Sequence, residues 1–358
     1  MKQFYPLSTF LTEYSEKNIG NTYRPVAVGR YGIRTRESIY SKELAKDYSK
    51  NKLIHKNTLT VGMGSVQIDI GVLTDDITYS VSPAYHTYKI AGVNAEYLRY
   101  CLECRNQDMF SRFVKRGSRQ GKTIDLKRWL TYEIPVYDEN RQQEIVDRFN
   151  QISELIEKRQ EQLVQLSELV KSRFIELFGD PVSNPKDWNV EPLGNRCGII
   201  TGNTPPRSEP ENYGKYIEWI KSDNINTPFT FITKAQECLS EAGFEKCRFV
   251  EAGSILMTCI AGSIDCIGNV AVTDRRVAFN QQINAIVPEQ DEVLYLYWLM
   301  QLSKPMIHRT INMALKGILS KSQLSEIVFP FPPITLQEQF AAFVEQTDKS
   351  KYYSITER

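Results

Sequence analysis

One segment occurs twice in the sequence, and this repeat restricts the possible folds more than any other feature. Ile134-Pro135 and Gln142-Gln143-Glu144-Ile145 are separated by six residues, and so are Phe329-Pro330 and Gln337-Glu338-Gln339-Phe340. The two copies lie 195 positions apart, and weaker matches occur upstream in the same order at offsets between 185 and 199. The sequence therefore predicts two diverged copies of one half.

The composition is that of a globular protein. The chain has 358 residues, of which 41% are hydrophobic and 24% are charged, which is enough for two ordinary domains. Its apolar stretches are far shorter than the roughly 20 residues that span a bilayer, and residues 1–10 have no signal-peptide pattern. We therefore expect no membrane association. The seven Cys are scattered, which favours a reducing cytoplasm.

Each half is predicted to contain short strands, a helix near 94–114 or 291–303, a Gly-containing loop, a short helix and a final long helix. The first long helix should run from about 139 to 178 and span about 60 Å, with Gly179-Asp180-Pro181 as its stop. The alternative is a core helix enclosed by its own domain. Apolar residues at a 3-4 spacing predict instead a coiled coil between this helix and a helix after Pro333. We call these residues the seam; they are Ile145, Phe149, Ile152, Ile156, Leu163, Leu166, Val170 and Leu177.

The net charge of +1 conceals a gradient along the chain. Residues 1–137 carry 21 Lys and Arg against 13 Asp and Glu, a net charge of +8. Residues 138–180 carry 6 against 10, and residues 181–358 carry 17 against 20. A basic first third can attract phosphate even though the whole chain is almost neutral.

Motifs for catalysis and metal binding are few and weak. The sequence has no phosphate-binding P-loop, zinc-protease, serine-hydrolase or dinucleotide-binding motif. Asp125-Leu126-Lys127 is compatible with a metal-dependent nuclease, but a helix cap at Asp125 is the preferred interpretation. Cys101 and Cys104 are interpreted as packing residues on a helix and not as zinc ligands. We expect no catalytic residues and no metal site.

The duplicated segments resemble the specificity subunits of type I restriction-modification systems. The resemblance is carried by Ile134-Pro135 through Ile145 and by Phe329-Pro330 through Phe340. Trp188-x3-Pro192-Leu193, Gly202-Asn203-Thr204-Pro205 and the helix exit Leu177-Phe178-Gly179-Asp180-Pro181 add to it. It covers nearly the whole chain.

The resemblance implies an α+β protein in which two similar globular target recognition domains are separated by two long helices that form an antiparallel coiled coil. The corresponding segments here are 1–137 for the first domain, 138–180 for the central helix, 181–333 for the second domain and 334–358 for the C-terminal helix, which is the shorter arm. Each domain would read one part of a split double-stranded DNA target. Rival hypotheses are a stand-alone nuclease and a coiled-coil adaptor with no DNA role.

The resemblance also implies partners. A specificity subunit is not an enzyme, binds no cofactor itself and holds two methyltransferase subunits together with restriction subunits, which translocate and cut DNA. The methyltransferase subunits use S-adenosylmethionine, and the restriction subunits use ATP and magnesium. The repeated segments at the starts of the two long helices would engage the methyltransferase subunits. The alternative is that these residues merely cap and solvate the helices. The segments consist of Gln142, Gln143, Glu144, Gln337, Glu338 and Gln339.

DNA contacts need cations for phosphates and bidentate donors or amides for base edges. In the first half, two segments meet this requirement, although a solvated basic loop is the alternative for each residue; their candidates are Arg30, Tyr31, Arg34, Arg36, Lys115, Arg116, Ser118, Arg119, Gln120 and Lys122. In the second half, fewer cations are available, and the candidates are Thr201, Asn203, Thr204, Arg207, Lys221, Asn224 and Lys316.

Overall fold

The computed structural model describes residues 2–39, 47–117, 121–311 and 317–356. The chain divides into two compact units, Met1–Glu157 and Lys158–Arg358. One helix, α4 (Glu139–Phe178), begins in the first unit and ends in the second. No helix in the described ranges is long and apolar enough to cross a membrane.

The first unit is built around a four-stranded antiparallel sheet with the strand order β2-β9-β6-β7. Helices α1 and α2 pack against it, and its core includes Leu59, Val61, Ile70, Leu98 and Trp129. In chain order its elements are β1 (Gln3–Pro6), η1 (Leu7–Thr9), β2 (Leu11–Tyr14), η2 (Ile19–Asn21), β3 (Val26–Gly29), β4 (Gly32–Thr35), η3 (Arg36–Ser38), β5 (Lys52–Ile54), β6 (Thr58–Met63), β7 (Ile68–Leu73), β8 (Tyr79–Val81), β9 (His86–Ile90), α1 (Ala95–Cys104), α2 (Asn106–Phe113), β10 (Val114–Gly117), β11 (Gly121–Ile124), α3 (Leu126–Trp129) and β12 (Glu133–Val136).

The second unit contains the corresponding four-stranded antiparallel sheet, β14-β22-β19-β20. A further five-stranded sheet, β15-β17-β16-β21-β18, is formed by segments that follow β14 and β20 in the chain, and we call it the distal sheet. The elements are β13 (Val190–Pro192), η4 (Leu193–Asn195), β14 (Cys197–Thr201), η5 (Pro210–Asn212), β15 (Tyr213–Gly214), β16 (Ile217–Ile220), α5 (Ser222–Ile225), β17 (Cys238–Leu239), α6 (Glu241–Glu245), β18 (Phe249–Val250), β19 (Ile255–Thr258), η6 (Ile264–Cys266), β20 (Val270–Val272), β21 (Val277–Phe279), β22 (Ile283–Pro288), α7 (Val293–Leu302), α8 (Lys304–Arg309), α9 (Lys321–Glu326), β23 (Val328–Pro330) and α10 (Ile334–Thr356).

The two units share a framework of corresponding elements in the same order, which confirms the predicted duplication. Strand β1 pairs with β12, and β13 pairs with β23, in each case just before the long helix. One hydrogen bond is reproduced closely: the Tyr97 hydroxyl donates to the Pro135 carbonyl at 2.7 Å, and the Tyr295 hydroxyl donates to the Pro330 carbonyl at 2.7 Å. Both units are therefore versions of one α+β fold.

Helix α4 has the predicted bounds. The Asp138 carboxylate accepts from the Arg141 backbone N–H at 3.0 Å at the start of the helix. At the other end, Gly179 has φ +80° and donates its N–H to the Ile175 carbonyl at 2.8 Å. Glycine adopts this left-handed conformation without a Cβ penalty, so the helix ends there.

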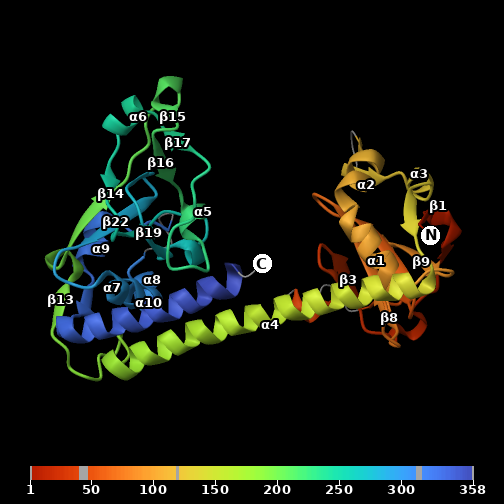
Figure 1. Cartoon of the computed structure of the whole chain (residues 1–358), viewed down its shortest axis with the longest axis horizontal. Helices are drawn as coiled ribbons and strands as arrows, with labels where there is room; N and C mark the ends of the chain where they lie inside the picture. The colour runs from red at the N-terminus through yellow and green to blue at the C-terminus, as the bar shows by residue number, and fades with distance from the viewer. Residues whose placement is uncertain (1, 40–46, 118–120, 312–316, 357–358) are drawn as a thin grey trace. The chain divides into compact units, whose positions relative to one another are not determined.

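Helix α10 lies beside the last part of α4 and runs in the opposite direction (Figure 1). The predicted seam was partly wrong, because Phe174 and Phe178, which it omitted, are the aromatic residues that pack on Phe340 and Tyr295. Val170 is buried as predicted. Other seam positions are exposed, namely Phe149, Ile152 and Ile156. A coiled coil along the whole helix stays a prediction.

Candidate nucleic-acid interface

An exposed aromatic side chain with two flanking cations stands at the tip of the β3–β4 hairpin. Gly29 pairs with Gly32, so Arg30 and Tyr31 form the turn. Tyr31 is 69% exposed, and the guanidinium carbons of Arg30 and Arg34 lie 5.6 and 5.2 Å from its ring centroid. Because cations over an aromatic face are held near it, this tip offers two positive charges and a stacking surface to a ligand outside the hairpin.

Arg36 has a different environment from the other two arginines of this segment. It begins the short helix η3, and its guanidinium carbon lies 5.1 Å from the ring centroid of Tyr48. Its Nε is buried and has no hydrogen-bond partner among the described residues. The Arg36 side chain is therefore partly buried in the first unit, whereas Arg30 and Arg34 lie on the exposed hairpin.

The second basic segment forms the β10–β11 hairpin, in which Arg116 pairs with Lys122. The Lys115 ammonium forms an ion pair with Asp125 at 2.8 Å, and Lys122 donates to the carbonyl of Ser65 and lies 5.3 Å from the ring centroid of Phe110. A two-stranded ribbon of this kind fits into the major groove of B-DNA. Ser118, Arg119 and Gln120 lie outside the described residues.

Asp125 acts as a helix cap, which confirms the preferred interpretation of that residue. Its carboxylate accepts from the Arg128 backbone N–H at 3.3 Å at the start of α3. The hydrogen bond from Lys115 holds the pKa of the Asp125 carboxyl below its usual value. Ser320 caps α9 at the equivalent position of the second unit, so this position has the same structural role in both copies.

In the second unit, the loop after β14 is fixed by contacts with two distant segments. Asn203 donates from its Nδ2 to the Lys246 carbonyl at 2.8 Å, and its Oδ1 accepts from the Arg248 backbone N–H at 2.8 Å. Thr204 donates to the side chain of Gln281. Thr201 donates its hydroxyl proton to Asn284 Oδ1 at 2.7 Å. Loop 201–204 is therefore a fixed surface and not a free turn.

Arg207 and Lys221, predicted from separate segments, are brought together around Trp219. The Arg207 guanidinium carbon lies 5.2 Å and the Lys221 Nζ 5.1 Å from the Trp219 ring centroid. Both cations form ion pairs with Glu237, whose pKa falls to about 2, chiefly through the hydrogen bond from Arg207. Two positive charges thus share one carboxylate, which leaves a net positive cluster beside an aromatic ring.

Asn224 has an internal role. It is buried, its Oδ1 accepts from the Lys221 backbone N–H at 3.0 Å, and its Nδ2 donates to Thr233 Oγ1 and the Lys234 carbonyl, each at 3.2 Å. Its side chain therefore organises the start of α5 and is not presented to solvent. Lys316 lies outside the described residues.

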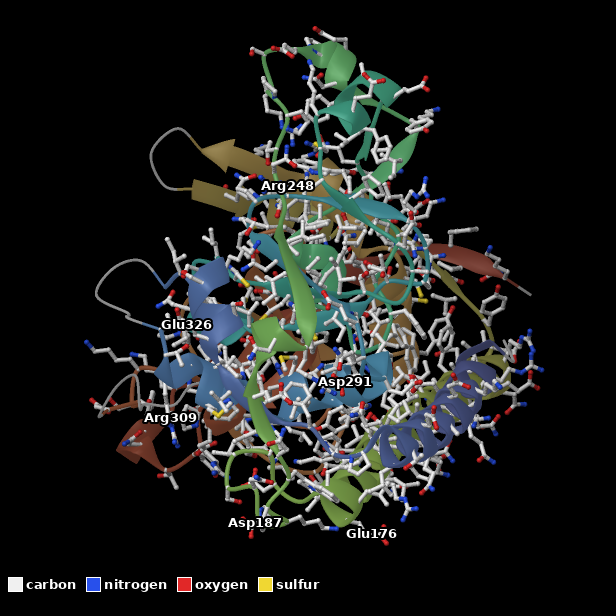
Figure 2. All side chains as sticks on the ribbon, turned by 90° about the vertical axis from the view of Figure 1, so that its left-hand side faces the viewer. Glu176, Asp187, Arg248, Asp291, Arg309 and Glu326 are labelled. Atoms are coloured by element: carbon white, nitrogen blue, oxygen red, sulfur yellow. The ribbon has the colours of Figure 1, made fainter. Side chains whose placement is uncertain are left out.

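Sequence reasoning missed Arg248 and Gln281. Both are exposed, and both reach loop 201–204 from segments far away in the chain. Arg248 Nη1 donates to the Thr201 carbonyl at 2.6 Å. Figure 2 shows Arg248 in the upper part of the second unit, well above Asp291 just before the start of α7. No local sequence pattern marks these two residues, because only the distal sheet brings them to the loop.

The repeated Gln/Glu segments contain one buried and two exposed positions each. Gln142 and Gln337 are buried, and their Oε1 atoms accept from the backbone N–H groups of Asn94 and Glu292 at 2.9 Å each. The two glutamines therefore attach the long helices to the segments that begin α1 and α7, and they are not available to a partner surface. The exposed members are Gln143, Glu144, Glu338 and Gln339.

The fold is that of a duplicated α+β protein, and each copy carries cations beside an aromatic ring, which is the exposed Tyr31 in the first unit and the buried Trp219 in the second. The family model of the type I restriction modification DNA specificity domain matches this chain twice, at residues 12–166 and 185–357. The chain belongs to this family.

Two curated relatives match parts of the chain. The specificity subunit of the type I restriction enzyme HindI from Haemophilus influenzae is 34% identical over 117 residues, which cover 31% of this chain and 24% of the relative. The specificity subunit of the type I restriction enzyme MjaIX from Methanocaldococcus jannaschii is 28% identical over 191 residues, which cover 49% of this chain and 42% of the relative. The chain thus spans less than half the length of either relative.

Solved structures share the fold. The S subunit of a type I restriction-modification system from M. genitalium has a TM-score of 0.56 at 14% identity, covering 99% of this chain and 91% of that one. A structure that describes complex assembly and conformational transition of the type I system has a TM-score of 0.51 at 16% identity, covering 98% of this chain and 91% of that one. At such low identities these matches support the fold alone.

Proposed function

We propose that this chain is the DNA sequence-recognition subunit of a type I restriction-modification complex, and that each unit reads one part of a bipartite target. The observation that carries the proposal is the double match of the DNA specificity domain, one match for each copy of the fold. Two readers on one chain gain specificity because both sites must be occupied at a spacing that the chain permits.

The surfaces described above support a DNA ligand. Phosphate contacts need cations, which both hairpins of the first unit supply, and base contacts need oriented donors and acceptors. In the second unit, loop 201–204 with Arg248 and Gln281 supplies such oriented groups. We therefore infer that the first unit relies more on charge and the second unit more on polar base contacts.

The chain itself performs no reaction under this proposal. Two methyltransferase subunits would use S-adenosylmethionine to methylate adenine, and restriction subunits would use ATP and magnesium. The exposed Gln143 and Glu144 on α4, together with Glu338 and Gln339 on α10, offer the two repeated surfaces for the methyltransferase subunits. We expect replacement of these four residues by Ala to weaken co-purification of a methyltransferase subunit without unfolding the chain, because all four side chains are exposed.

The proposal is tested by expressing the chain with the methyltransferase subunit of its own system and sequencing the methylated adenines. We expect a motif with two specified parts separated by unspecified bases. A single continuous motif would count against two independent readers. A parallel incubation of the purified chain with plasmid and magnesium addresses the rival function, because cleavage without any partner would show a nuclease.

A further inference from the structure

Arg248 differs from the cations that surround it in the second unit. Arg207 and Lys221 pair with Glu237, and Lys246 pairs with Glu209. Arg248 is exposed and has no carboxylate partner in the part of the chain that the structure describes. Its full positive charge therefore remains available to a ligand.

The Arg248 backbone is held by bonds on both sides. Its N–H donates to Asn203 Oδ1 at 2.8 Å, while Asn203 Nδ2 donates to the Lys246 carbonyl at 2.8 Å, two residues earlier. The residue after it, Phe249, pairs with Ala278 in the distal sheet. These hydrogen bonds fix the point from which the arginine side chain leaves the chain.

The guanidinium is also oriented. Arg248 Nη1 donates to the Thr201 carbonyl at 2.6 Å, at the end of β14. With one Nη occupied in this way, Nε and the other Nη retain their N–H groups for a ligand, because a guanidinium carries five donors in a rigid plane. A planar donor set in a fixed orientation is suited to a partner with two acceptors side by side.

A second polar group stands at the same loop. Gln281 is exposed and accepts a hydrogen bond from Thr204, and its amide nitrogen makes no hydrogen bond within the described ranges. The loop backbone packs closely against the segment that carries Gln281, since a Cβ added to Gly202 would lie 2.2 Å from the Asn280 carbonyl oxygen. Arg248 and Gln281 thus face solvent from one compact, closely packed surface.

We propose that Arg248 reads a guanine in the part of the DNA target recognised by the second unit. This inference rests on the proposed function and assigns a specificity residue within it. Guanine presents N7 and O6 as adjacent acceptors in the major groove, and bidentate arginine is the commonest specific contact to them. A phosphate would need only a positive charge, whereas the anchored backbone and the bond to Thr201 give Arg248 a defined orientation as well.

The test uses the full chain expressed with its methyltransferase subunit, followed by sequencing of methylated adenines. In Arg248→Gln, we expect one G·C position in one part of the motif to become degenerate, with discrimination at that position reduced about 5- to 150-fold. Arg248→Lys should relax the same position, because lysine keeps the charge and loses the fork. The matched control is Arg309→Gln on α8, an exposed arginine distant from Arg248 in Figure 2, and it should leave the motif unchanged.

Three results would overturn the assignment. The first is a wild-type motif in which the part that changes in loop 201–204 alter contains no G·C pair. Another is an unchanged motif in Arg248→Gln with methylation lowered equally at all sites, which identifies a phosphate contact. The third applies if Arg248→Gln abolishes methylation, so that no motif can be read from it. In that case a wild-type motif in Arg248→Lys would overturn the assignment, because it would show that a positive charge alone suffices at this position. A wild-type chain with no bipartite motif would instead contradict the proposed function itself.

Discussion

Arg196 holds Asp291 through two N–H···O bonds of 2.9 Å each, and the Asp291 side chain is 0% exposed while that of Arg196 is 21% exposed. Gln337 Nε2 donates to the same carboxylate at 2.7 Å. This network joins the residue between η4 and β14, the segment before α7 and the start of α10. The buried carboxylate is therefore a junction on which the packing of the second unit depends.

Asp291→Ala should lower the free energy of unfolding of the chain by about 3 kcal/mol. The change leaves the Arg196 guanidinium with only the longer ion pair to Glu191, at 3.6 Å, and leaves the Gln337 amide with only its bond to the Pro332 carbonyl. The measurement is urea unfolding followed by tryptophan fluorescence. Glu251→Ala is the control, since Glu251 and Arg276 form an exposed ion pair that solvent and salt screen, so its loss should cost much less than the loss of Asp291. Equal effects of the two changes would refute the role given to Asp291.

Gly202→Ala should disorder loop 201–204 and impair recognition by the second unit. The added Cβ would lie 2.2 Å from the Asn280 carbonyl oxygen and 2.5 Å from that of Phe279, which are backbone atoms that cannot move aside cheaply. Gly262→Ala is the matched control, because nothing lies within 4 Å of its Cβ position. Motif sequencing separates the two variants, and an unaltered motif in Gly202→Ala would show that this loop does not contribute to recognition.

Glu237 should make the distal sheet sensitive to acid. Its pKa in the folded chain is about 2, below its ordinary value of 4.5, so the stability it adds is complete above about pH 4.5 and is lost as the pH falls toward 2. The difference in unfolding free energy between wild type and Glu237→Gln should therefore shrink over this interval. Glu245→Gln, which removes an exposed carboxylate with no ion pair among the described residues, serves as the control. A difference that stays constant with pH would contradict the Arg207–Glu237–Lys221 cluster.

Replacing Arg30 and Arg34 together by Ala should weaken DNA binding and make it less dependent on salt. Removing one cation from a phosphate reduces the slope of log K against log salt by about 0.9, so removing two reduces it by about 2. The control removes two charges from α4 instead, in Arg159→Ala/Arg173→Ala. Fluorescence anisotropy at several salt concentrations measures both. If the hairpin variant kept the wild-type slope, these arginines would not contact phosphate.

The duplicated fold could be predicted because its signals are local. The Ile-Pro and Phe-Pro segments precede long helices in both copies, Gly179 ends α4, and Asp125 caps α3. Each of these depends on a few neighbouring residues and on rules of backbone geometry. The predicted duplication and helix bounds were therefore confirmed.

The packing that tertiary structure creates could not be predicted. Phe174 and Phe178 were left out of the helix seam, because several 3-4 spaced stripes run along α4 and only the position of Phe340 and Tyr295 selects one. Arg248 reaches Thr201 across 47 positions of sequence. Gln142 and Gln337 were correctly singled out as repeated, but their burial follows from the packing of the long helices on the segments before α1 and α7.

Under the proposed function, each unit reads its own part of a bipartite target. The most direct test sequences the methylated adenines produced by the wild-type chain, by Arg30→Ala/Arg34→Ala and by Gly202→Ala, each expressed with the same methyltransferase subunit. We expect two specified parts in the wild-type motif, loss of specificity in one part only in Gly202→Ala, and the wild-type motif with methylation lowered at all sites in Arg30→Ala/Arg34→Ala. If Gly202→Ala alters both parts, or if the wild-type motif is continuous, the two units do not each read their own part.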